Sequence, residues 1–79
     1  MTTVNIDRSI DARGMLCPGP LMSLIGAIRE GEVGTVIEVL SSDEGSKTDI
    51  PAWISKAGHE VVEVVEDEGF THFIVRKAR

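Results

Sequence analysis

The stretch CPGPLMSLIGAI, residues 17–28, predicts a helix with one apolar face. Its apolar residues fall at positions i, i+3, i+4 and i+7, namely Leu21, Leu24, Ile25 and Ile28. This spacing places them on one side of a helix, which has to be buried in the fold. Arg29 suits the last turn, where a cation interacts favourably with the helix dipole, and Gly31 suits the position just beyond the end.

The beginning of this helix determines the chemistry expected of Cys17, the only cysteine in the chain. A residue before proline disfavours the helical conformation, so Cys17 is the expected N-cap, and Pro18 suits the first helical position. The amides of Gly19 and Leu21 then lack helical partners and, with the positive helix end, stabilise an anion near the Cys17 sulfur. Because Gly19 has no side chain, we expect an accessible and mildly acidic thiol.

A lone cysteine is also often a small buried residue without chemistry, and this alternative stays open for Cys17. The neighbouring Met15, Leu16 and Met22 form either an apolar docking rim or, above all for Leu16, part of the core. Trp53 belongs to an apolar stripe and is expected in the core.

The other segments predict four strands and a second helix. The alternation of apolar and polar residues, or a run of β-branched residues, predicts strands over Val4–Asp11, Thr35–Leu40, Glu60–Glu66 and Thr71–Arg76. The short link between the last two strands predicts a hairpin. The second helix is expected to begin near Ser46–Thr48, with Pro51 in its first turn.

The order β-α-β-α-β-β predicts a single α+β domain over residues 1–79. The expected architecture is a two-layer α/β sandwich, a four-stranded mixed sheet with both helices on one face, because each helix has only one apolar stripe. Glu38 and Glu63 then point to the open face. Both helices start at the same end, which brings Asp49 near Cys17. There Asp49 orients Arg13, contacts a partner, or satisfies amides of its own helix.

The composition limits the classes of function that this chain can have. The chain has 79 residues, one cysteine, two histidines and a formal net charge of −5. One cysteine makes no internal disulfide, and the dispersed His59 and His72 do not suggest a metal site. The acidity argues against direct nucleic-acid binding; it favours solubility and allows steering toward basic protein partners. There is no secretory signal or membrane span, so we expect a cytoplasmic protein. We also expect a monomer and no cofactor.

The segment from Asp11 to Leu21 resembles the Cys-Pro-x-Pro signature of the TusA/SirA sulfur-carrier family, and the resemblance continues at 49–53 and 58–60. It implies the same two-layer fold. It also implies a sulfurtransferase that carries sulfur as a persulfide on its cysteine. The donor is a cysteine desulfurase or a rhodanese-like protein, and the acceptor is a protein of tRNA thiolation, molybdenum-cofactor assembly or sulfur oxidation. Some relatives are instead linked to selenium or thiosulfate.

The resemblance assigns roles residue by residue. Cys17 corresponds to the sulfur-bearing cysteine, Pro18 and Pro20 to structural prolines, and Gly19 to the variable position of the signature. The polar positions near the site correspond to Asp11, Arg13 and Asp49. A different class of function, a regulatory protein-binding module without thiol chemistry, is favoured by the half-open sheet face and the acidic surface.

Overall fold

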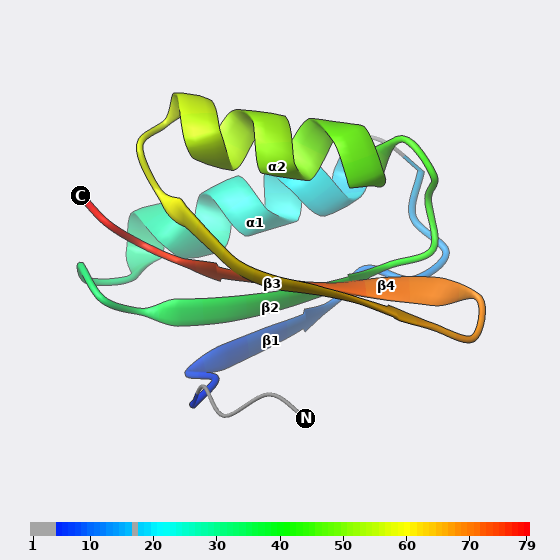
Figure 1. Cartoon of the computed structure of the whole chain (residues 1–79), viewed down its shortest axis with the longest axis horizontal. Coiled ribbons are helices and arrows are strands. Elements are labelled where there is room, and N and C mark those ends of the chain that lie inside the picture. The colour runs from blue at the N-terminus through cyan, green and yellow to red at the C-terminus, as the bar shows by residue number, and fades with distance from the viewer. Residues whose placement is uncertain (1–4, 17) are drawn as a thin grey trace.

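Two helices lie side by side on one face of a four-stranded sheet in the computed structural model, which describes residues 5–16 and 18–79 (Figure 1). The elements in order are β1 (Arg8–Asp11), α1 (Gly19–Glu30), β2 (Val36–Ser41), α2 (Ser46–Lys56), β3 (Glu60–Asp67) and β4 (Phe70–Arg76). This order and the two layers confirm the predicted α+β fold. No helix among the described residues is both long and apolar enough to cross a membrane.

The sheet has the strand order β1-β2-β4-β3 and is mixed, as predicted. β1 and β2 are parallel, with α1 as the crossover between them, whereas β4 is antiparallel to both β2 and β3. The predicted hairpin of β3 and β4 is confirmed. Its turn contains Gly69 with a φ of 80°, a left-handed conformation that glycine adopts without steric cost.

The first strand is shorter than the predicted range of 4–11. Val4 lies outside the described residues, and the pairing of β1 begins at Arg8, opposite Ile37. Immediately before it, the Val36 amide donates to the Asp7 carboxylate at 2.9 Å, while the Asp7 amide donates to the Val36 carbonyl at 2.9 Å. A side chain replaces a backbone acceptor here, so the regular ladder starts only after Asp7.

The core lies between the helix layer and one face of the sheet. It contains, at 2% exposure or less, Leu24 and Ile28 of α1, Ile50 and Ile54 of α2, and Ile37, Val39, Phe73 and Val75 of the sheet. Trp53, expected in the core, is only partly buried and packs against this cluster. Because side chains alternate along a strand, Glu38 and Ile74 belong to the opposite, open face.

Helix α2 begins within the predicted window, at Ser46, but the expectation that Pro51 lies in its first turn is wrong. Ser46 is 1% exposed; its amide donates to the Asp43 carbonyl at 3.2 Å and its hydroxyl to the Asp43 carboxylate at 3.4 Å. These contacts start the helix at Ser46, so that a full helical turn precedes Pro51. Pro51 therefore lies inside the helix, and because it has no amide hydrogen, the Lys47 carbonyl lacks its usual helical donor.

The shared core predicts a large effect of truncating one helix side chain. Replacing the fully buried Ile54 by alanine should lower the free energy of unfolding by about 2–5 kcal/mol, because it removes apolar contacts and leaves a cavity. Urea unfolding followed by circular dichroism measures this change. The exposed neighbour Ser55 provides the control, and Ser55→Ala should shift the free energy by less than about 0.5 kcal/mol. Equal effects of the two variants would contradict the proposed core.

Candidate functional site

The segments that flank Cys17 lie at the end of the molecule where β1 and β2 finish and both helices begin (Figure 1). The prediction that the two helices start at the same end is therefore confirmed. Asp49 stands in the first turn of α2, at this end. Cys17 lies outside the described residues, so the exposure and surroundings expected for its sulfur stay predictions.

The loop that leads to Cys17 is held against the ends of the strands. The Ala12 amide donates to the Leu40 carbonyl at 2.9 Å and so extends the parallel pairing beyond β1. Gly14 then turns the chain with a φ of 86°, and its amide donates to the Ser42 hydroxyl at 3.0 Å. The loop is thus fixed at two points before it reaches Leu16.

The helix start differs from the prediction by one residue. Pro18, not Cys17, is the N-cap, and α1 begins at Gly19, with Pro20 buried in its first turn. The Gly19 amide donates to the Leu16 carbonyl at 2.8 Å, so the expectation that it is unpartnered is wrong. The reason is the conformation of Pro18, with φ −94° and ψ 19°, which closes a tight turn from Leu16 to Gly19 before the helix proper.

Arg13 is oriented by Asp11 and by the β3–β4 hairpin. Its Nε and Nη2 donate to the two carboxylate oxygens of Asp11, each at 2.9 Å, in a bidentate pair. The guanidinium carbon lies 4.9 Å from the centre of the Phe70 ring. The hydrogen bonds from Arg13 lower the pKa of Asp11 to about 2. The structure therefore joins Asp11 and Arg13, two predicted site residues, to the hairpin.

Three exposed apolar residues lie near Cys17 in the sequence. We call Met15, Leu16 and Met22 the apolar rim. These side chains are 40%, 80% and 58% exposed, respectively, so they do not belong to the core. The Met15 side chain lies over Gly19: a Cβ atom at Gly19 would come within 3.0 Å of the Met15 Cε. A larger residue at position 19 would have to displace Met15 and so reshape the rim.

A polar cluster around His72 on the open sheet face was missed by the sequence analysis. The His72 Nδ1 lies 3.0 Å from a Glu38 carboxylate oxygen, and its Nε2 lies 3.2 Å from an Asp67 carboxylate oxygen. The Ser9 hydroxyl also donates to Glu38 at 2.9 Å. These residues come from different strands, so only the strand register brings them together. The period-two pattern of β2, which places Glu38 on this face, was the one available signal.

The pKa values of the two histidines shift in opposite directions. Burial of the His72 ring lowers its pKa, but the hydrogen bonds to Asp67 and Glu38 outweigh burial, so the pKa lies above the ordinary 6.5. Burial, followed by the charges of Lys77 and Arg79, lowers the pKa of His59. The stabilising effect of the His72 cluster is therefore complete below the unfolded pKa, near 6.5, and is lost as pH rises through the higher folded value.

A proton NMR titration of the imidazole signals should give a higher pKa for His72 than for His59. Glu38→Gln should lower the pKa of His72, because it removes one carboxylate partner. Glu30→Gln, which removes a carboxylate paired with Arg8 on the helix side of the sheet, should leave it unchanged. A His72 pKa below that of His59 would show that the cluster does not form.

Comparison of the whole fold identifies its class. The crystal structure of a SirA-like protein from Desulfitobacterium hafniense superimposes with a TM-score of 0.80 at 27% sequence identity, covering 91% of this chain and 99% of that chain. The fold is therefore that of the SirA-like proteins.

Sequence comparison then defines the family. The family model described as sulfurtransferase TusA matches residues 8–77. A protein of Archaeoglobus fulgidus is 54% identical over 70 residues, which cover 89% of this chain and 96% of the relative. The sulfur carrier protein TusA of Pseudomonas aeruginosa is 35% identical over 75 residues, covering 95% of each chain. This chain belongs to the sulfurtransferase TusA family.

Proposed function

We propose that this protein is a sulfur carrier that accepts sulfur as a persulfide on Cys17 and passes it to an acceptor protein. Membership of the sulfurtransferase TusA family carries the proposal, since 35%-identical relatives have the name sulfur carrier protein TusA. The sequence adds support, because Cys17 is the only cysteine and directly precedes Pro18, the N-cap of α1.

The proposed loading step is a thiol–persulfide exchange. The Cys17 thiolate attacks the outer sulfur of a persulfide on a donor protein, such as a cysteine desulfurase or a rhodanese-like protein. A sulfur–sulfur bond forms on Cys17 while the bond in the donor persulfide breaks, and the donor cysteine leaves as a thiolate. The step involves no net oxidation. Delivery repeats it, with the acceptor nucleophile attacking the outer sulfur on Cys17.

The residues around Cys17 have proposed supporting roles. The positive end of α1 favours the thiolate by about 0.3–1 kcal/mol when exposed. Pro18 and Pro20 stiffen the helix start, and Gly19 leaves the space that the Met15 side chain of the apolar rim occupies. Asp11 and Arg13 hold the loop before Cys17 through their bidentate pair.

The proposed partners are a protein donor and a protein acceptor, which the carrier meets in turn as a cytoplasmic monomer. Asp49, at the start of α2, is assigned to this docking side. The acceptor belongs to tRNA thiolation, molybdenum-cofactor assembly or sulfur oxidation. The proposal includes no cofactor and no direct contact with nucleic acid.

The proposal predicts a mass change that depends on one residue. Incubation with a cysteine desulfurase and cysteine should add one sulfur atom, ~32 Da, to the intact chain. Cys17→Ser should gain no mass, because the hydroxyl does not accept sulfur. Ser55→Ala, which keeps the thiol and changes an exposed residue near the far end of α2, should load like the native chain. Intact-mass spectrometry without reducing agent measures all three.

Two outcomes would count against the carrier function. The first is an absence of sulfur on the native chain with several donors. The second is a Cys17→Ala variant that keeps both cellular function and partner binding. The latter would support a regulatory protein-binding module, because such a module does not need the thiol.

A further inference from the structure

A cavity of about 240 Å³ lies at the end of the molecule where β2 finishes and α2 begins. We call it the hairpin cavity, because its walls are the end of β2, the first turn of α2 and the β3–β4 hairpin; the wall residues that matter here are Asp43, Glu44, Lys47, Glu66, Phe70 and Thr71. One water needs only about 10–15 Å³ of such space, so a side chain of several heavy atoms fits.

The charge of the cavity wall is negative. Lys47 is its only cation among the described lining residues, and its ammonium lies 2.9 Å from Glu66 and 3.4 Å from Glu44. The hydrogen bond to Glu66 raises the pKa of Lys47 and keeps it charged. Since Asp43 and Asp67 bring the carboxylates of the lining to four, the wall retains net negative charge after Lys47 is paired. A cationic ligand is therefore favoured.

Thr71 supplies an independent observation. It is only 3% exposed and lines the cavity from β4. Its neighbours across the strands are Ser41 and Glu66, on the side of the sheet that faces the helices. The Thr71 hydroxyl makes no hydrogen bond within residues 5–16 and 18–79, although a buried hydroxyl normally has a partner. It is an acceptor in place for a donor that enters from outside.

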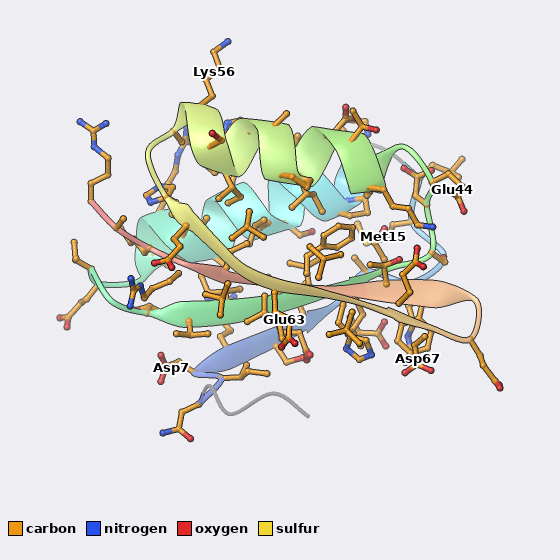
Figure 2. The ribbon with its side chains drawn as sticks, viewed as in Figure 1. Asp7, Met15, Glu44, Lys56, Glu63 and Asp67 are labelled. Carbon is orange, nitrogen blue, oxygen red and sulfur yellow. The ribbon has the colours of Figure 1, made fainter. Side chains whose placement is uncertain are left out.

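The hairpin cavity also adjoins the loop that leads to Cys17. Ser42, in its wall, accepts the Gly14 amide at 3.0 Å, and Phe70, also in its wall, carries the Arg13 guanidinium on its ring. Figure 2 shows Glu44 and Asp67 at the same end of the molecule as Met15 of the apolar rim. A partner that reaches Cys17 therefore meets this cavity as well.

We propose that the hairpin cavity receives an arginine side chain from a protein that exchanges sulfur with this chain. A guanidinium matches the wall better than an ammonium does. Its five donors suit the carboxylates of Glu44 and Glu66 and the Thr71 hydroxyl together, whereas an ammonium has only three. The apolar rim and the arginine site then act as two points of one docking surface. This inference rests on the proposed function, because it assumes a protein partner at Cys17.

An NMR titration of the full-length Cys17→Ser chain tests the site without any sulfur transfer. The probe is Nα-acetyl-arginine amide, and the matched control is Nα-acetyl-citrulline amide, which has nearly the same shape but no charge. The arginine probe should shift the amide signals of residues 42–44 and 69–71 in a saturable way, and the citrulline probe should not. Failure here leaves the carrier proposal intact, because loading of Cys17 is measured separately by mass.

Variants locate the binding groups. Glu66→Gln should weaken binding of the arginine probe about tenfold, because it removes a charged acceptor. The matched control is Glu30→Gln: Glu30 is exposed to a similar degree and is also paired with a cation, but it lies on α1 away from the cavity. Thr71→Val should also weaken binding while the melting temperature stays the same or rises, because it removes an unpartnered buried hydroxyl.

Three outcomes would overturn the inference. They are equal shifts with both probes, absence of saturable shifts at residues 42–44 and 69–71, and equal loss of binding in Glu66→Gln and Glu30→Gln. Tighter binding of Nα-acetyl-lysine amide than of the arginine probe would also reject the preference for a guanidinium.

Discussion

The apolar stripes of α1 and α2 pack against one face of the sheet, and this contact places the loops that lead into the two helices. Leu24 and Ile28 on one helix, and Ile50 and Ile54 on the other, share the sheet residues that they cover. Each helix can cover that face only by running back along it from the end of the preceding strand. Both helices therefore begin at one end of the molecule, and the loops that precede them meet there.

The loop before Cys17 is held by contacts from three other parts of the chain. Leu40 and Ser42 bind its backbone, Asp11 orients Arg13, and Phe70 of the hairpin supports the guanidinium. Leu16 and the neighbouring methionines nevertheless remain exposed. In a carrier, a backbone that is already fixed beside an exposed apolar rim loses less conformational entropy when each partner binds.

Polar side chains protect the sheet face that the helices leave open. Ile74 is only 2% exposed, although its side chain belongs to this face, where it lies opposite Glu38 in the strand register and two residues from His72. Long polar side chains can shield apolar neighbours while their charged ends remain hydrated. The carboxylates of the hairpin cavity differ, because Lys47 neutralises only part of their charge. The open face thus contributes to stability, whereas the carboxylates of the hairpin cavity keep negative charge that can bind a cationic partner.

The sequence alone determined the element order, the helix stripes and the hairpin, because periodicity and glycine-bearing turns are local properties of the chain. It also singled out Cys17 and its prolines. It missed the N-cap at Pro18 and the internal position of Pro51, because a Leu16–Gly19 turn and an Asp43–Ser46 contact shift helix ends by amounts that periodicity does not resolve. Only the tertiary structure brought His72 to Glu38, Arg13 to Phe70, and Thr71 into a cavity wall. These contacts join residues of different elements, and their distances follow from strand register and helix packing, which no spacing along the chain encodes.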